Sequence, residues 1–245
     1  MSLSDQEIIK KFHIKPKDKV LDVGGSMKQH DLINVHTLAD LIRPEEAPYS
    51  PSKLKAKEFA RVDFLKDKLP FKDKEFDFCL CTHTLEDLPF PFPLMDEISR
   101  VAKRGYIATP SMGSDLVFSH FDMTDWMTGG RRVPGYSHHK WLFYKKGNKF
   151  LVLPKNYGLL YTSEFHFVKW LGESEFRYYW EGKINYEEVK DLNIHDLISH
   201  YRRYIELNKS KLIKGIPLIY LDNPVYVLKS MLKKILKRGE GFRRI

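Results

Sequence analysis

The sequence predicts an α/β fold with a doubly wound, mostly parallel sheet. The apolar run at 19–23 ends in two glycines, as a buried strand ends in a tight turn. The near-continuous apolar run at 76–81 is typical of a central parallel strand that is covered on both faces. Between strand-like runs, residues 93–103 carry apolar side chains at helical spacing. Strands that alternate with helices indicate a parallel sheet.

In the stretch KVLDVGGSMKQHD at 19–31, the predicted strand is followed by a loop of the kind that lets a ligand approach the backbone closely. The loop contains Gly24 and Gly25, but it lacks the third glycine of the dinucleotide fingerprint. The next apolar run, at 35–41, contains Asp40. A glycine loop followed by an acid one strand later is typical of a nucleoside site, where the acid accepts ribose hydroxyls. Taken alone, the pattern fits an ordinary glycine-ended strand equally well.

The helix predicted at 93–103 places Leu94, Ile98 and Val101 on one face. Gly105 is expected to end this helix as a C-cap glycine, and the next strand is expected at 106–109. The cysteines Cys79 and Cys81 are expected to share one strand face as reduced core thiols rather than as a disulfide or a metal pair.

Residues 112–208 are expected to hold the remaining core strands and a substrate cap, inserted or C-terminal, that is rich in aromatics and histidine. Runs at 141–144 and 150–153 flank KKGN and predict a hairpin. A second hairpin is predicted from 164–170 and 175–180, around LGES. A cap over the strand ends would exclude water from a reaction site.

The net charge of +9 belongs to the C-terminal tail. Residues 209–245 hold ten Lys or Arg and two acids, while the other 208 residues hold 31 basic and 30 acidic groups. The charge of the main body therefore gives no strong signal for nucleic-acid binding. The predicted organisation is a first half of the core at 1–111, the remaining core and cap at 112–208, and a basic amphipathic tail at 209–245.

Within the tail, residues 225–245 place apolar side chains near one helical face and basic ones beside it. Such a helix either docks its apolar face on its own domain, which we favour, or lies on an anionic membrane surface. No run of 18 apolar residues and no signal-peptide pattern is present. These features predict a cytoplasmic protein, with peripheral membrane contact as the alternative.

The order VLDVGGS, ADL, VDF, LPFKDKEFDFCLCTHTLEDL and EISRVAKRGYIATPS resembles the class I S-adenosylmethionine-dependent methyltransferases, in their small-molecule branch. The resemblance covers about residues 12–111. It implies a Rossmann-like sheet and S-adenosylmethionine as the cofactor. The missing third glycine agrees with this implication, because S-adenosylmethionine has no pyrophosphate that needs close backbone approach.

The resemblance implies roles for individual residues. The first loop would surround the methionine and ribose portions, Asp40 would accept the ribose hydroxyls, and Asp63 would meet the adenine amino group with Phe64 beside the ring. Thr82 and His83 would lie near the sulfonium. The implied cofactor-binding residues are Asp22, Gly24, Gly25, Ser26, Asp40, Asp63, Phe64 and Thr82. Three departures are a short first helix, Met27–Lys28 in place of a third small residue, and Asp87 where a histidine often follows the LE pair.

The cap sequence carries the candidate catalytic and substrate-binding groups. A histidine suits removal of a hydroxyl proton during methyl transfer, so His138 and His139 are predicted as catalytic together with His83. Two neighbouring arginines could clamp a phosphate or carboxylate. The predicted substrate-binding residues are His120, Arg131, Arg132 and Trp141. No metal is expected; His120, Asp122 and His139 would be an alternative metal set, although their spacing does not support it.

The sequence therefore predicts a methyltransferase, with O-methylation of a small-molecule or glycan-type acceptor as the expected reaction. Oxygen is preferred because histidines rather than carboxylates dominate the cap. Methylation of RNA or protein is the alternative, and it would need a continuous basic face at the cofactor cleft. A non-catalytic module that binds cofactor or docks on a membrane is the alternative of another class. Absence of S-adenosylmethionine binding would favour that module.

Overall fold

The computed structural model describes residues 3–48, 50–118, 133–190 and 193–215. The predicted features at His120, Asp122, Arg131, Arg132 and 225–245 lie outside these described residues. The contacts divide the chain into two units. The first contains 1–115, 138–155 and 172–201, and the second contains 116–137, 156–171 and 202–245. Among the described helices, none has the length and apolar character needed to cross a membrane.

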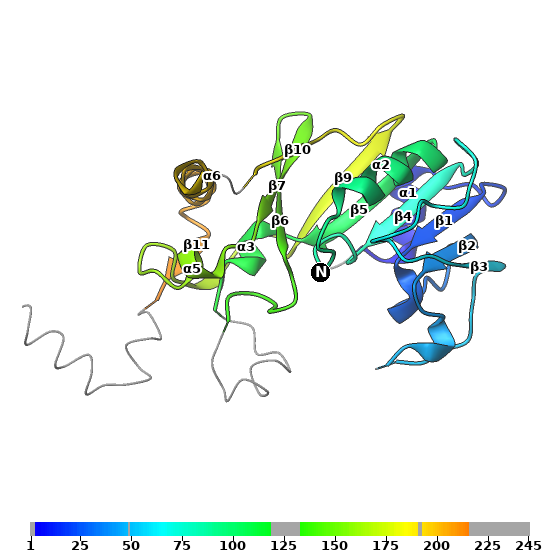
Figure 1. The fold of residues 1–245 in the computed structure, drawn as a ribbon, viewed down its shortest axis with the longest axis horizontal. Coiled ribbons are helices and arrows are strands. Elements are labelled where there is room, and N and C mark those ends of the chain that lie inside the picture. The colour runs from blue at the N-terminus through cyan, green and yellow to red at the C-terminus, as the bar shows by residue number, and fades with distance from the viewer. Residues whose placement is uncertain (1–2, 49, 119–132, 191–192, 216–245) are drawn as a thin grey trace, which may run out of the picture. The chain divides into compact units, whose positions relative to one another are not determined.

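A six-stranded sheet in the order β3-β2-β1-β4-β5-β9 forms the centre of the first unit (Figure 1). Its strands are β1 (Val20–Val23), β2 (Val35–Asp40), β3 (Glu58–Arg61), β4 (Phe78–Thr82), β5 (Arg104–Pro110) and β9 (Glu175–Glu181). The first five are parallel, and β9 pairs antiparallel with β5. The strand order reverses between β1 and β4, where an open α/β sheet binds ligands. This topology confirms the predicted mostly parallel α/β sheet.

The sheet is covered on both faces. Along β4, Phe78 and Leu80 belong to the cluster that includes helix α1 (Asp5–Phe12). Cys79 and Cys81 point to the opposite cluster, which includes helix α2 (Phe92–Val101). This alternation explains the near-continuous apolar run, because both faces of β4 are buried. Both cysteines are buried and free, as predicted.

Among the described residues, the crossovers on the β1 side of the sheet contain no α-helix. Between β1 and β2 the chain forms one 3₁₀ turn, η1 (Gly25–Met27), and between β2 and β3 another, η2 (Pro44–Glu46). The predicted short first helix is thus a single turn. Helix α1 instead precedes β1, and a capping box formed by Ser4 and Glu7 starts it.

A three-stranded sheet, β10-β7-β6, also belongs to the first unit. It contains β6 (Trp141–Lys146), β7 (Lys149–Pro154) and β10 (Tyr186–Glu188). Strands β6 and β7 pair antiparallel around Gly147, whose φ is +65°. The hairpin predicted around KKGN is therefore confirmed. Phe143, Phe150 and Val152 from this hairpin pack in the same cluster as α2.

The second predicted hairpin is wrong. Strand β8 (Phe167–Trp170) pairs with β11 (Leu212–Lys214), whereas β9 pairs with β5. The reason is burial, because β9 supplies Phe176, Tyr178 and Trp180 to the core of the large sheet. Strands β8 and β11 lie in the second unit with helix α5 (Tyr157–Leu160).

The predicted C-cap role of Gly105 is also wrong. Helix α2 ends at Val101 with Ala102 as its C-cap, and Gly105 lies inside β5. A Cβ at Gly105 would lie 2.4 Å from the carbonyl oxygen of Cys79 and 2.9 Å from the Trp180 ring. The glycine is thus required for close packing of the sheet rather than for a helix end. The remaining helices are α3 (Met112–Asp115) and α6 (Ile194–Leu207).

Candidate functional site

A pocket of about 270 Å³ lies at the C-terminal ends of β1 and β2 and in the loops after β3 and β4. We call it the glycine-loop pocket. Its lining residues are Gly24, Met27, Asp40, Leu41, Ile42, Asp63, Phe64, Leu65, His83, Thr84, Asp87 and Leu88. The structure thus brings together five predicted site residues, which lie at or after the ends of four strands. Thr84, Asp87 and Leu88 were missed as lining residues, although they directly follow β4, where a parallel sheet places its site.

Gly24 is one of the residues that line this pocket. Its φ is +79°, and its N–H donates to the carbonyl of Ala39 at 2.9 Å. A Cβ at this position would lie 2.3 Å from Thr84 Oγ1. A glycine is therefore needed here for two reasons, the left-handed backbone conformation and the close approach to the loop after β4.

Asp40, at the end of β2, holds the first loop in place. One oxygen, Oδ2, accepts the N–H of Ser26 at 3.0 Å, and the other, Oδ1, accepts the N–H of Leu41 at 2.7 Å. Ser26 is fully buried and its Oγ donates to the carbonyl of Ile42 at 2.7 Å. This bond connects the loop after β1 to the loop after β2. Each Asp40 oxygen keeps a second lone pair, which a ligand hydroxyl can use.

Asp63 and Phe64 follow β3 and form the opposite wall. Asp63 accepts the N–H of Leu65 at 3.0 Å and pairs with Lys66 at 2.8 Å. The hydrogen bond from Lys66 lowers the pKa of the Asp63 carboxyl, so this acid is ionised and accepts hydrogen bonds. Phe64 packs against the main core cluster and supplies an aromatic wall.

Asp22 does not line the glycine-loop pocket. It is 2% exposed on β1, and a Cβ at Gly25 would lie 2.0 Å from its Oδ2. Burial raises the pKa of Asp22 to about 6. Its Oδ1 has no hydrogen-bond partner among the described residues. Gly25 is therefore needed to let the loop pass over this carboxyl, which supports the loop without facing the pocket.

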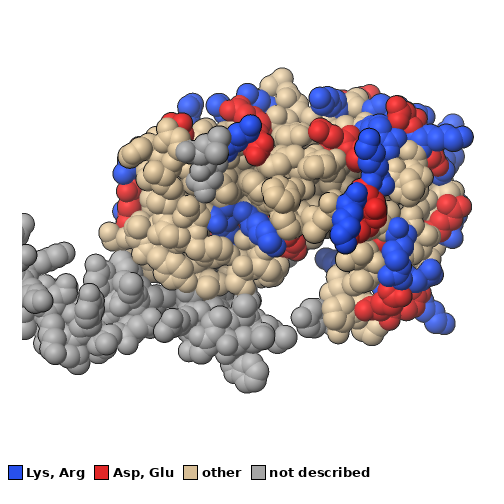
Figure 2. Space-filling view, in the orientation of Figure 1, with Lys and Arg blue, Asp and Glu red and all other residues tan. Residues whose placement is uncertain are grey.

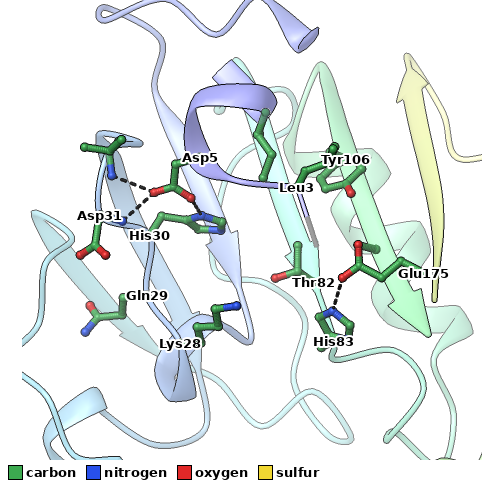
Figure 3. A pocket seen from close by; sticks show the side chains of 13 residues that line it. Leu3, Asp5, Lys28, Gln29, His30, Asp31, Thr82, His83, Tyr106 and Glu175 are labelled. Atoms are coloured by element: carbon green, nitrogen blue, oxygen red, sulfur yellow. Dashed lines mark hydrogen bonds and ion pairs between the residues drawn. The ribbon is translucent and has the colours of Figure 1, made fainter. Parts of the chain in front are cut away.

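A second pocket, of about 280 Å³, lies beside the ends of β4, β5 and β9 (Figure 3). We call it the edge pocket. It is lined by Leu3, Asp5, Ile8, Lys28, Gln29, His30, Asp31, Leu32, Thr82, His83, Tyr106, Ala108 and Glu175. Predicted Thr82 lies here, and His83 lines both pockets. No sequence pattern pointed to Asp5 and His30, whose Oδ1 and Nδ1 lie 2.6 Å apart although 25 residues separate them.

His83 is held between two carboxylates. Its Nε2 lies 3.0 Å from Glu175 Oε1 and its Nδ1 lies 3.3 Å from Glu86 Oε1. These contacts, that with Glu175 first, raise the pKa of His83 to about 9. The imidazole is therefore protonated at neutral pH and donates hydrogen bonds, so it does not suit removal of a proton. Its φ of +53° is a strained conformation that these contacts maintain.

We expect the His83 imidazole to titrate near pH 9 in an NMR experiment on the folded chain. Glu175→Gln should lower that midpoint by roughly 1 pH unit because it removes one of the two carboxylates. Because the folded pKa exceeds the ordinary 6.5, these contacts stabilise the fold fully below pH 6.5, and their contribution is lost as the pH rises through about 9. Glu181→Gln, in the same strand, is the matched control. An unchanged midpoint in Glu175→Gln would contradict this assignment.

His138 and His139 precede β6 and lie near Asp87, a residue of the glycine-loop pocket. The His138 side chain is half exposed and that of His139 is buried. Trp141 lines neither pocket. Its Nε1 donates to the carbonyl of Leu88 at 2.9 Å, so it helps to hold a lining residue of the glycine-loop pocket in place. The predicted catalytic and substrate-binding roles of these three residues stay predictions.

Part of the first unit is similar to a known protein family. Residues 37–108 match the family model of the methyltransferase domain. A SAM-dependent methyltransferase structure from Methanosarcina mazei is 22% identical, with 45% of this chain and 60% of that chain covered and a TM-score of 0.34. One from Aquifex aeolicus is 25% identical, with 45% and 66% covered and a TM-score of 0.33. No curated protein matches.

The chain spans 60% of the length of the first of these structures. The family match covers β2 to β5, which include Asp40, Asp63 and the β4 loop of the glycine-loop pocket. Residues 37–108 are therefore similar to the methyltransferase domain, and the cofactor that this similarity implies is S-adenosylmethionine.

Proposed function

We propose that the chain transfers a methyl group from S-adenosylmethionine to an oxygen atom of a small-molecule or glycan-type acceptor. The observation that carries this proposal is the glycine-loop pocket, where Gly24, Asp40 and Asp63 converge at the ends of parallel strands. His83 joins this pocket to the edge pocket, so a cofactor in one and an acceptor in the other would meet beside it.

The residues of the glycine-loop pocket fit this cofactor. Gly24 lines the pocket without a side chain, and its left-handed backbone lets the loop after β1 pack closely against Thr84. Asp40 offers acceptor lone pairs for ribose hydroxyls, and Asp63 offers them for an adenine amino group. Phe64 provides an apolar surface for the adenine ring. When bound, S-adenosylmethionine supplies an electrophilic methyl group.

The edge pocket suits an acceptor that presents oxygen atoms. Lys28 donates hydrogen bonds and accepts none, so it favours hydroxyl, carbonyl or carboxylate groups, whereas both ring nitrogens of His83 already contact Glu175 and Glu86. His30 lines the edge pocket, where Asp5 holds its Nδ1 at 2.6 Å, but its Nε2 is shielded from solvent. The predicted His138 and His139 stay the candidates for taking the acceptor's proton.

Asp40→Asn is expected to weaken S-adenosylmethionine binding about 10–100-fold in calorimetry. Loss of a charged hydrogen-bond acceptor costs about 1.5–3 kcal/mol. Asp196→Asn, on the exposed start of α6, is the matched control and should bind as the unchanged chain does. Thermal unfolding of both variants shows whether the first loop keeps its fold.

Equal affinity in Asp40→Asn and the unchanged chain would contradict the cofactor site. Absence of binding in the unchanged chain would favour the non-catalytic module. Methylation of RNA is less well supported, because Lys and Arg lie beside Asp and Glu on the face in Figure 2 rather than in one continuous basic surface of the described residues. Methyl transfer to a polynucleotide but not to hydroxylated small molecules would overturn the proposed acceptor class.

A further inference from the structure

Three metal-ligating side chains converge beside the glycine-loop pocket. His138 Nε2 lies 3.8 Å from Asp87 Oδ1, and His139 Nε2 lies 4.0 Å from the same oxygen. All three donor atoms lie within 4.8 Å of one another. Two donors about 2.1 Å from one ion, at a tetrahedral angle, are roughly 3.4 Å apart. Contraction by less than about 1.5 Å, within reach of side-chain rotations, would therefore place all three donors on one ion.

Asp115 and Lys155 fix the direction of the His139 ring. His139 Nδ1 lies 2.9 Å from Asp115 Oδ2, and Lys155 Nζ lies 2.9 Å from Asp115 Oδ1, with both partners buried. A carboxylate at Nδ1 directs the other ring nitrogen, Nε2, toward Asp87, as carboxylates do behind metal-ligating histidines.

Asp87 is held from its backbone rather than through Oδ1. The Asp87 carbonyl accepts a hydrogen bond from Lys140 Nζ, and the carbonyl of Glu86 accepts the Lys140 N–H, each at 2.7 Å. These bonds tie the loop after β4 to the segment that carries the histidines. Asp87 Oδ1 is shielded from solvent and has no hydrogen-bond partner among the described residues. A shielded carboxylate oxygen that faces two imidazoles is a position where a cation would satisfy an otherwise costly group.

We infer that Asp87, His138 and His139 bind one divalent cation of the zinc type. Two imidazole nitrogens and one carboxylate oxygen favour Zn²⁺ and neighbouring first-row metals over Mg²⁺ or Ca²⁺, which prefer oxygen ligands. Three protein ligands leave a fourth position open, as in catalytic rather than structural zinc sites. The half-exposed His138 gives this position a path to solvent.

The inference goes beyond the proposed methyl transfer and does not depend on it. It conflicts with a catalytic base at His138 or His139, because a metal-bound nitrogen has no lone pair for a proton. Since Asp87 lines the glycine-loop pocket, a bound cation would lie at the wall of that pocket.

Zinc titration of the full chain, without a polyhistidine tag and after dialysis against chelator, tests the site. Calorimetry should show one Zn²⁺ bound per chain, and elemental analysis after dialysis against Zn²⁺ should give the same ratio. His138→Ala and Asp87→Ala should each weaken binding at least roughly tenfold, since each removes one of three ligands. His195→Ala, at an exposed position of α6, is the matched control and should bind as the unchanged chain does.

A fourth variant tests Asp115 as a positioning residue. Asp115→Asn should weaken zinc binding about 10–100-fold while the ratio of one ion per chain is kept at saturation. Because Asp115 is buried, circular dichroism checks its fold, and the more exposed His138→Ala gives the same test without a buried change.

No stoichiometric zinc binding, or equal affinity in the unchanged chain, His138→Ala and Asp87→Ala, would overturn the inference. S-adenosylmethionine affinity is measured separately on the chelator-treated chain. Absence of that affinity contradicts the proposed function alone, whereas absence of zinc binding contradicts the cation site alone.

Discussion

Gly24→Ala is expected to lower the free energy of unfolding by about 2–4 kcal/mol. An alanine at φ +79° is in a left-handed conformation, and its Cβ would lie 2.3–2.9 Å from three side-chain atoms of Thr84. Thr84 is short, and its own Cβ is one of those atoms, so the loop after β4 must move. Because Thr84 lines the glycine-loop pocket, S-adenosylmethionine affinity should also fall by roughly tenfold or more. Urea unfolding and calorimetry measure the two effects.

Gly182→Ala is the control that separates conformation from contact. Gly182 has φ +72°, and nothing lies within 4 Å of its Cβ position. This variant carries the same backbone cost of about 1–2 kcal/mol without a steric contact and lies outside both pockets. If Gly24→Ala and Gly182→Ala lose equal stability and both keep the cofactor affinity, the close approach of Gly24 to Thr84 has no energetic role.

The parallel sheet could be predicted because its strands carry their own local signals. The run at 76–81 is apolar throughout because Phe78 and Leu80 pack on one face and Cys79 and Cys81 on the other. The hairpin around Gly147 is equally local, since one turn fixes its register. Strand β9 could not be assigned in this way. Its partner β5 is about 70 residues distant in the chain, and no turn connects them.

The residues of the candidate site also differ in whether local sequence patterns could predict them. Asp40 and Asp63 follow strands, so the pattern of strands and loops places them at one sheet edge, and both line the glycine-loop pocket. The partners that set the charge of His83 could not be predicted. Glu175 lies 92 residues from His83, and only the antiparallel pairing of β9 with β5 brings them together. The same holds for Asp115 behind His139, which depends on tertiary packing alone.

Gly105 shows how one local signal can have two meanings. A glycine shortly after a helix is common as a C-cap, and this motif predicted a helix end. Its actual neighbours, the Cys79 carbonyl and the Trp180 ring, come from strands on both sides of β5. Close packing across a sheet leaves no trace in the residues next to a glycine, so the local interpretation failed.

Asp22→Asn is expected to raise the free energy of unfolding at pH 7 by up to about 3 kcal/mol. Burial raises the pKa of Asp22 from its usual 3.8 to about 6, and each unit is worth about 1.4 kcal/mol. At pH 7 the folded chain must keep a buried carboxylate ionised, and its Oδ1 has no hydrogen-bond partner among the described residues. A neutral amide of the same shape removes this cost.

The pH dependence separates this effect from a change in packing. Since the folded chain binds the Asp22 proton more tightly than the unfolded chain, the unchanged protein gains stability from this group as the pH falls from about 6 to 3.8. The advantage of Asp22→Asn should therefore be largest above pH 6 and disappear near pH 4. Urea unfolding of both chains between pH 4 and 7.5 measures it, with Asp196→Asn as the exposed control. A stability difference that is constant over this range would contradict the prediction, because it would show that burial does not raise the pKa of Asp22 in the folded chain.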